Sequence, residues 1–305
     1  MRPSAPLEKS RMQTIESLKR KIKSTNDLLG VVKTMKALAA VSIRQYQRAV
    51  ESLIDYANTV EMGLQIVLKD QPEPAGSTRP APINRLGAII FGSDQGLCGQ
   101  LNALISTHAL EEMDSLNIPK ENRTVLTIGE RVQDYIKDAG IKVVEGLYTP
   151  SSTAGITPAV QELIMILEDW HFRQQIQHIY LYYNQYISGA NYKPFTLKLL
   201  PVDREWLKNL KTKKWESKTI PLYTMHWDAL FLSLIREYLF VSLFQAFAES
   251  LASENASRLA AMQNAEKNIE ERLDEIYLQF HRQRQMTITE ELLDIVAGYE
   301  VLKGQ

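Results

Sequence analysis

Several residue types are scarce in this chain of 305 residues, and each scarcity excludes a class of protein. The single cysteine, Cys98, excludes an intrachain disulfide and a metal site built from several cysteines, and it is typical of a reducing, intracellular setting. Neither charge dominates, because 35 Lys and Arg stand against 36 Asp and Glu; this argues against a protein built around nucleic acid or an anionic membrane. Residues 1–20 lack the apolar stretch of a signal peptide. Hydrophobic residues, in contrast, make up 45% of the chain, which excludes global disorder.

Proline is missing from long stretches at both ends of the chain. None occurs between Pro6 and Pro72 or after Pro221, so both ends are predicted to be long helices around a compact middle domain. We divide the chain into five parts on this basis. They are an extension at 1–12, expected to be disordered, with Met12 as an alternative translation start; a helix at 13–70; a linker at 71–83; an α/β domain at 84–222; and a helix at 223–305.

The N-terminal helix carries a heptad repeat. Counting a positions from Ile15 and d positions from Leu18, only Thr25 and Lys36 interrupt the apolar stripe over eight heptads, which indicates a left-handed coiled coil rather than a helix lying on a globular core. The segment from Trp227 to Lys303 shows a similar stripe with one shift of register. Charges complement as well: residues 9–48 hold ten Lys and Arg against two acids, and residues 249–300 hold five against eleven. The two helices are therefore predicted to pair, in antiparallel fashion.

The two predicted helices differ in length. At ~1.5 Å per residue the first spans ~85 Å and the second ~115 Å, so the second is expected to extend ~30 Å beyond the first. The overhang contains Ile288, Leu292, Leu293, Ile295, Val296, Val301 and Leu302. A helix end this apolar is predicted to be buried by another protein.

One segment is long enough to span a bilayer. Residues 229–248 are largely apolar, but Arg236 and Glu237 stand near their middle, and a central Arg costs roughly 2.5–3.5 kcal/mol on insertion. We therefore expect a buried helix of a soluble assembly rather than a membrane span.

The middle of the chain is predicted to be α/β. Strand-like runs at 86–91, 124–128, 142–147, 177–183 and 195–201 are rich in branched and aromatic residues. Helical patterns at 100–113, 130–139 and 158–170 alternate with the first four. This order predicts a largely parallel sheet built from βαβ units.

Most candidate motifs for catalysis or ligand binding lack the residue spacing that such sites require. The turn at 91–99 lies where phosphate-binding loops lie, yet it matches neither G-x-G-x-x-G nor a Walker loop, so a tight strand-to-helix turn is preferred over a nucleotide site. Cys98 is more simply a structural thiol than a nucleophile, since the five histidines form no dyad or metal spacing. The basic cluster at 19–23 lacks interleaved aromatics, which favours a solvated or partner-facing surface over nucleic-acid binding.

Three segments together resemble a known family. They are SENASRLAAM at 253–262 with RQMTITEEL at 284–292 and IVAG at 295–298; KTMKALAA at 33–40; and SDQGLCGQLN at 93–102. In this order they resemble the gamma subunit of the rotary ATP synthases, over about residues 15–302. The resemblance implies an antiparallel coiled coil of both termini with a Rossmann-like parallel-sheet domain between them.

The resemblance also implies a function. The coiled coil would act as a rotor shaft inside a hexamer of alpha and beta subunits, and the globular foot would sit on the membrane ion-driven ring and hold the epsilon subunit. It implies no catalysis, no cofactor, no metal and no nucleotide bound by this chain, and a peripheral place on the cytoplasmic face of a membrane. The coupling ion, proton or sodium, is set by the ring.

Six residues match family positions that contact the beta subunits. Arg284, Gln285, Thr289 and Glu291 match the positions that hydrogen-bond or ion-pair with the beta-subunit catch loop. Met35 and Arg258 match shaft positions near the beta-subunit lever. Without the resemblance, the first four would be assigned to ordinary solvated helix surface.

Some positions depart from the family pattern. Ser42 stands where a basic residue is usual, Gln95 where Arg is usual and Gln100 where Gly is usual, and no insertion with a cysteine pair is present. These departures suggest a divergent or alternative bacterial branch. Two other functions stay open on the residues alone: a nucleotide-binding α/β enzyme with a coiled-coil dimerisation arm, and a coiled-coil scaffold for nucleic acid, which the pI of about 6.6 disfavours.

Overall fold

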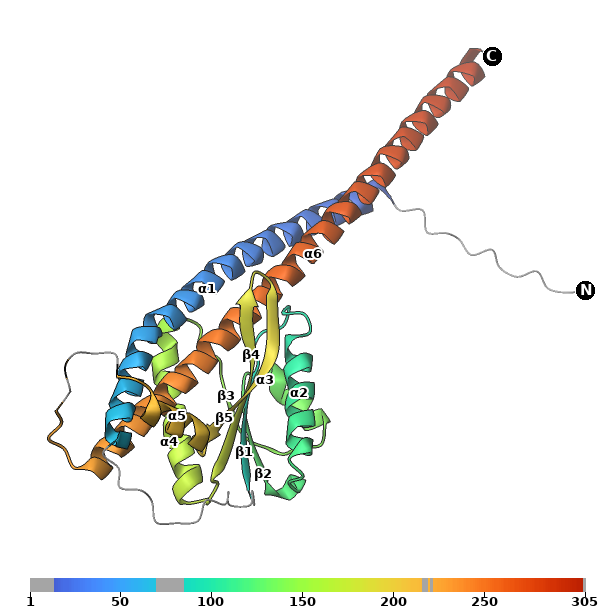
Figure 1. The fold of residues 1–305 in the computed structure, drawn as a ribbon. Helices are drawn as coiled ribbons and strands as arrows, with labels where there is room; N and C mark the ends of the chain where they lie inside the picture. Colours follow the sequence, from blue (N-terminus) through green and yellow to red (C-terminus); the bar gives the residue numbers. More distant parts are fainter. Residues whose placement is uncertain (1–13, 70–84, 216–218, 220–221, 304–305) are drawn as a thin grey trace, which may run out of the picture. The chain divides into compact units, whose positions relative to one another are not determined.

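The fold was obtained as a computed structural model that describes residues 14–69, 85–215, 219 and 222–303 (Figure 1). The predicted extension at 1–12 and linker at 71–83 lie outside these residues. Contacts divide the chain into two compact units, 38–261 and the paired ends 1–37 and 262–305. The five-part division drawn from the sequence stays a prediction.

The α/β domain contains a five-stranded sheet. Its strands are β1 Leu86–Phe91, β2 Arg123–Ile128, β3 Val143–Leu147, β4 His178–Ser188 and β5 Asn191–Leu200, in the order β3-β2-β1-β4-β5. The pairings among β1 to β4 are parallel, whereas β4 and β5 form an antiparallel hairpin, so the predicted largely parallel sheet is confirmed. The sequence placed the end of β4 too early, at residue 183. The strand continues to Ser188 because Gly189, with φ 59°, closes a tight hairpin.

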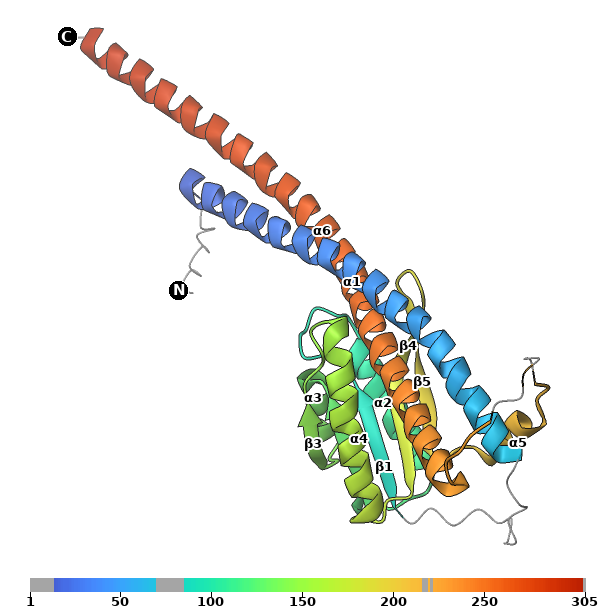
Figure 2. The ribbon, with the colours of Figure 1, turned by 90° about the vertical axis from the view of Figure 1, so that its left-hand side faces the viewer.

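Alternate residues of β1 separate the two layers that cover the sheet. Leu86, Ala88 and Ile90 pack with α2 (Leu101–Ser115) and α3 (Glu130–Asp138). Ile89 and Phe91 pack on the other face, with α4 (Ile156–Phe172) and the N-terminal part of α6 (Trp227–Lys303). Figure 2 shows α4 and this part of α6 on the same side of the sheet. A strand buried on both faces is typical of a parallel sheet between helical layers.

A short helix, α5 (Arg204–Thr212), was not predicted. Its nine residues are too few for a clear apolar period, although Asp203 caps it by accepting the Glu205 amide at 2.9 Å. Leu210 of α5 joins Val60 and Leu64 in a third apolar cluster.

Both long helices are confirmed, as α1 (Ile15–Lys69) and α6 (Trp227–Lys303). Every a and d position of α1 counted from Ile15 and Leu18 is buried or half-buried, so the heptad prediction also holds residue by residue. In the unit of the paired ends, Lys33 bridges to Glu270 at 3.1 Å and Asn26 contacts the Tyr277 hydroxyl at 3.5 Å, which fixes an antiparallel pairing.

Lys36, which interrupts the apolar stripe of α1, has a charged partner on α6. The Lys36 ammonium hydrogen-bonds and ion-pairs with Glu266, and this contact lowers the pKa of Glu266. The predicted charge complementarity between the helices is thus realised at this position.

The apolar run at 229–248 lies in α6. In the part of the chain that the structure describes, α6 is the one helix long and apolar enough to cross a membrane, judged by length and composition. Within that run, Leu243, Ala246 and Phe247 are buried in the core of the α/β domain, and Arg236 forms an ion pair with Glu168 at 3.3 Å. These contacts support the predicted role as a packed helix.

Candidate functional site

The loop after β1 is organised by two side chains. Asn102 accepts the Ser93 amide at 3.0 Å and donates to the Ser93 hydroxyl at 2.8 Å. Asp94 accepts the Glu130 amide at the start of α3, and its other oxygen accepts the Thr149 amide and hydroxyl at 2.7 and 2.6 Å. The Asp94 carboxylate therefore lies at the N-terminus of α3, where the helix dipole favours a negative charge. These contacts order the loop as a tight strand-to-helix turn.

Gly92 makes this turn possible. A Cβ at this position would lie 2.4 Å from the Val132 Cβ and 2.6 Å from the Asn102 side-chain oxygen. Gly92→Ala is therefore expected to destabilise the α/β domain by about 1–3 kcal/mol through overpacking. Gly96→Ala, in the same loop, is the matched control, because nothing lies within 4 Å of its Cβ. Thermal unfolding of both variants checks this; equal melting temperatures would contradict the close packing at Gly92.

Cys98 lies inside the same turn as a structural thiol. It is 2% exposed, and its Sγ lies 3.4 Å from the Ser93 hydroxyl. Across the described residues, no group of three or more His, Cys, Asp and Glu side chains is placed to hold a metal ion.

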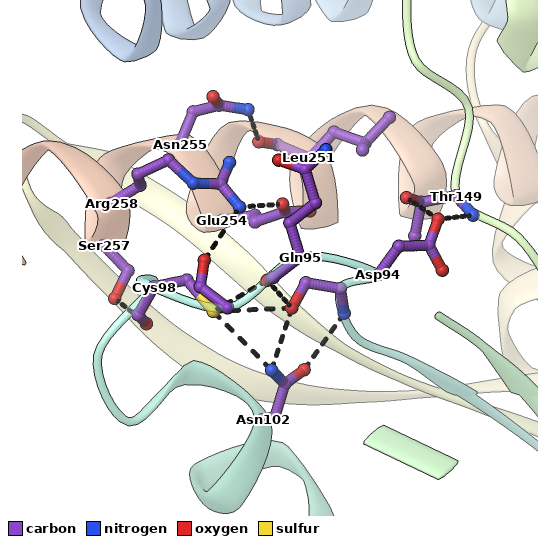
Figure 3. A network of polar contacts seen from close by, with 12 residues as sticks. Asp94, Gln95, Cys98, Asn102, Thr149, Leu251, Glu254, Asn255, Ser257 and Arg258 are labelled. Carbon is purple, nitrogen blue, oxygen red and sulfur yellow. Dashed lines mark hydrogen bonds and ion pairs between the residues drawn. The ribbon is translucent and has the colours of Figure 1, made fainter. Parts of the chain in front are cut away.

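The C-terminal helix reaches this turn with polar side chains (Figure 3). The Ser257 hydroxyl donates to the Cys98 carbonyl at 2.6 Å, and Arg258 ion-pairs with Glu254 at 2.6 Å while one of its amino groups lies 3.5 Å from the Gly96 carbonyl. Arg258 and Glu254 are only 9% and 6% exposed. They line a pocket of about 220 Å³ together with residues of α1, of two loops and of α6 itself: Ser42, Tyr46, Asp94, Gln95, Thr149, Pro150, Ser151, Leu251 and Asn255.

Burial controls the titration of the groups around this pocket. It raises the pKa of Glu254 above its ordinary value, despite the opposing effect of the Arg258 charge. Burial also raises the pKa of Tyr46, and the nearby Glu254 carboxylate acts in the same direction. The Arg258–Glu254 ion pair is therefore shielded from water. Removal of either residue would leave the charge of the other buried without a partner.

Glu249, one turn earlier on α6, is a second buried carboxyl group. Burial raises its pKa, although hydrogen bonds from Gln245 and Gln185 oppose this effect. Because the folded-state pKa exceeds the unfolded one, ionisation of Glu249 costs stability, and the cost grows as pH rises through that interval above about 4.5.

Glu249→Gln is therefore expected to melt higher than wild type at pH 7–8, by about 2–4 °C for each kcal/mol regained. The difference should shrink as pH is lowered toward 4.5 and vanish below it, where the wild-type carboxyl becomes protonated in both states. Melting curves from pH 4.5 to 8 check this. A variant that is less stable at neutral pH, or a difference that does not vary with pH, would contradict the assigned cause.

The predicted catch residues lie in the other unit, on the last turns of α6. Arg284, Gln285, Thr289 and Glu291 are all exposed, and the Thr289 hydroxyl donates to the Gln285 carbonyl at 2.9 Å. Gln285 and Thr289 line a shallow groove of about 480 Å³ with Arg282, Met286 and Glu290. Met35, on α1, is half-buried.

The structure thus groups four of the six predicted residues and separates Arg258 from them. It also adds Glu254 and Ser257, which sequence reasoning assigned no role. The available signal was a set of polar residues, Ser253, Glu254, Ser257 and Arg258, within an otherwise apolar face of α6.

Comparisons with known proteins agree with this architecture. A family model described as ATP synthase matches residues 14–302. The ATP synthase gamma chain of Pasteurella multocida is 30% identical over 296 residues, covering 94% of this chain and 99% of that one. The gamma chain of Desulfitobacterium hafniense is 28% identical over 301 residues, covering 96% and 100%.

Solved structures show the same fold. A chain of the Euglena gracilis mitochondrial ATP synthase, in its OSCP/F1/c-ring assembly, matches with a TM-score of 0.63 at 16% identity, covering 94% of each chain. A chain of the Tetrahymena thermophila central stalk and c-ring matches with a TM-score of 0.56 at 21% identity, covering 77% of this chain and 99% of that one. The fold and the family match define a subunit of a rotary ATP synthase. The chain belongs to the ATP synthase gamma-chain family, whose members form the central stalk.

Proposed function

We propose that this chain is the rotor shaft that couples ion flow through a membrane ring to the conformational cycle of the beta-subunit catalytic sites. The observation that carries the proposal is the end of α6. In the unit of the paired ends, α6 continues past the first residue of α1 (Figure 2). Along its last turns it exposes seven large apolar side chains, from 45% to 68% exposed: Met286, Ile288, Leu292, Leu293, Ile295, Val296 and Tyr299.

Such a surface calls for a partner. Contiguous apolar side chains on a lone helix are costly in water and are typical of a protein–protein interface. The side chains of Val301 and Leu302, which the sequence added to this set, lie outside the described residues. We propose that the apolar end of α6 turns inside a collar formed by the alpha and beta subunits.

The polar residues beside the apolar end supply an orientation-specific contact. Arg284, Gln285, Thr289 and Glu291 are exposed and are proposed to bind the catch loop of one beta subunit at a time. Charge-assisted hydrogen bonds depend strongly on geometry, so such contacts can differ among three beta subunits around an asymmetric shaft. Met35 is proposed to contact the beta-subunit lever. Arg258 is buried and ion-paired with Glu254, and its contact with the lever stays a prediction.

The remaining partners follow from the same proposal. The α/β domain is proposed to bind the ring and the epsilon subunit at the cytoplasmic face of the membrane, with the ring selecting proton or sodium. We propose no bond chemistry and no cofactor for this chain.

Co-expression with the alpha and beta subunits of the same organism tests the proposal. Purification through a tag on beta is expected to yield an active ATPase with one copy of this chain per three beta subunits. A chain that purifies separately would contradict the proposal. Nucleotide affinity of the separate chain would then favour an α/β enzyme, and salt-sensitive nucleic-acid binding would favour a scaffold.

A further inference from the structure

The C-terminal helix occupies the crevice where doubly wound sheets bind their ligands. In such sheets the ligand lies beyond the carboxyl ends of the parallel strands, where the strand order reverses. Here the order reverses between β1 and β4. The Ser253 hydroxyl of α6 donates to the Asn184 carbonyl of β4 at 2.7 Å, and the Ser257 hydroxyl donates to the Cys98 carbonyl after β1 at 2.6 Å.

Three side chains on one face of α6 make these contacts: Ser253, Ser257 and Arg258, which donate to the carbonyl oxygens of Asn184, Cys98 and Gly96. We call this set the polar latch (Figure 3 shows its Ser257 and Arg258 part). Ser253 and Ser257 are 0% and 6% exposed. The Tyr192 hydroxyl of β5 lies 3.1 Å from the Ser257 oxygen and acts as donor to it, since the Ser257 proton is used on Cys98.

The loop that receives the polar latch is itself held on three sides. Asn102 of α2 binds Ser93 through two hydrogen bonds, and Asp94 binds both the start of α3 and Thr149 after β3. A force applied to α6 through Cys98 is therefore passed to α2, α3 and the sheet rather than absorbed by a loose loop.

Beside the polar latch, α6 also presents small apolar side chains to the domain, whereas the large side chains Leu243, Phe247 and Leu251 pack into the core earlier along the helix. Ala248, Ala252 and Ala256, one turn apart along α6, are 0%, 2% and 0% exposed. Gly99 lies opposite, where a Cβ would come within 3.2 Å of the Ser257 hydroxyl oxygen. Small apolar contacts resist separation, but they are not directional and offer little resistance to rotation of a helix about its own axis. Hydrogen bonds weaken steeply when their angles change.

We propose that the polar latch fixes the rotational position of α6 on the α/β domain, so that a turn of the domain turns the shaft without slip. The inference rests on the proposed rotor function. Ser253, Ser257 and Arg258 are positioning residues, and the Glu254 carboxylate holds the Arg258 side chain in place from the preceding turn. Because α6 is one uninterrupted helix to Lys303, torque that enters at the polar latch can be carried along it.

The test uses a double variant that carries both Ser253→Ala and Ser257→Ala. It is compared with the control variant Ser250→Ala, and both are studied in the assembled complex. Ser250 is on the same helix and is 3% exposed, but it is not part of the polar latch, so the control removes a hydroxyl at similar burial. Thermal rotation of a probe on the α/β domain is recorded while the catalytic sites are inhibited. The double variant is expected to show an angular variance about two-fold larger than wild type, because directional bonds are lost.

A second readout separates slip from simple destabilisation. ATP hydrolysis without an ion gradient is expected to stay near the wild-type rate, whereas ions pumped per ATP against a gradient should fall. Tyr192→Phe, which keeps the ring and removes one hydrogen bond to Ser257, should change both readouts in the same direction but less. Ser250→Ala should change neither.

An assembled double variant with the angular variance and pumping ratio of Ser250→Ala would overturn the polar latch and leave the rotor function intact. If the wild-type chain itself does not assemble with alpha and beta subunits, the proposed function fails first. The two failures are therefore distinguishable.

Discussion

Replacing Arg284 and Gln285 together with alanine is expected to lower the ATPase rate of the assembled complex by about tenfold or more. Hydrogen bonds to charged groups contribute roughly 1.5–3 kcal/mol each, and 1.4 kcal/mol corresponds to a factor of ten. Both side chains are exposed on α6, so their removal leaves the chain's own packing unchanged. The effect should therefore appear in the turnover or assembly of the complex and not in the melting temperature of the chain.

The matched control is Arg272→Ala with Gln279→Ala, earlier on the same helix. These residues are also exposed, and Arg272 contacts only its helical neighbour Glu275 among the ion pairs of the described residues. The control double variant should retain most of the ATPase rate. Equal rates for both double variants, with full assembly, would remove Arg284 and Gln285 from the proposed catch.

A charge placed in the seam of the paired helices is expected to unfold that region. Val32 is 6% exposed and occupies a d position, whereas its neighbour Val31 is 56% exposed. Val32→Asp loses the burial of a Val side chain, about 1.5–3 kcal/mol, and adds the cost of a buried carboxylate. Val31→Asp makes the same chemical change on the solvent side and has the same helix propensity cost.

Helical circular dichroism recorded during heating checks this pair. The Val32→Asp variant should lose helical signal at least ~5 °C below wild type, since ~1 kcal/mol corresponds to about 2–4 °C in a chain of this size. Val31→Asp should melt within ~2 °C of wild type. Similar melting of both variants would mean that α1 is not packed through the a and d positions.

The long helices were predictable because their signal is local and repeated. A stripe every 3.5 residues identifies the buried side of α1 before any partner is known, and the opposite charges of 9–48 and 249–300 identify the partner. The Lys36 interruption could not be explained from α1 alone. Its partner Glu266 lies 230 residues away in the sequence.

The site was less predictable, for a related reason. The burial of Arg258 depends on a loop about 160 residues earlier and on Glu254, whose carboxylate sits one turn before it. Nothing in the spacing of 253–262 distinguishes side chains that point at this loop from side chains that point at a partner. Ala252 and Ala256 are the local indication that this face of α6 packs against another segment, because small side chains on a helix allow a close approach.

The strand order was likewise not determined by the pattern of the sequence. Alternation of strands and helices predicts a parallel sheet, but the placement of β4 beside β1 results from non-local packing of Ile89, Leu181 and the α4 side chains into one core. The short helix α5 was missed because nine residues give too little periodicity.

ATP-driven rotation tests the central claim most directly. A probe attached to the α/β domain of this chain, in a complex immobilised through its beta subunits, should turn in one direction on addition of ATP and stop three times per revolution. The rotor account predicts that this motion depends on hydrolysis and ceases with a non-hydrolysable nucleotide. A complex that hydrolyses ATP at full rate while the attached probe stays still would contradict the account.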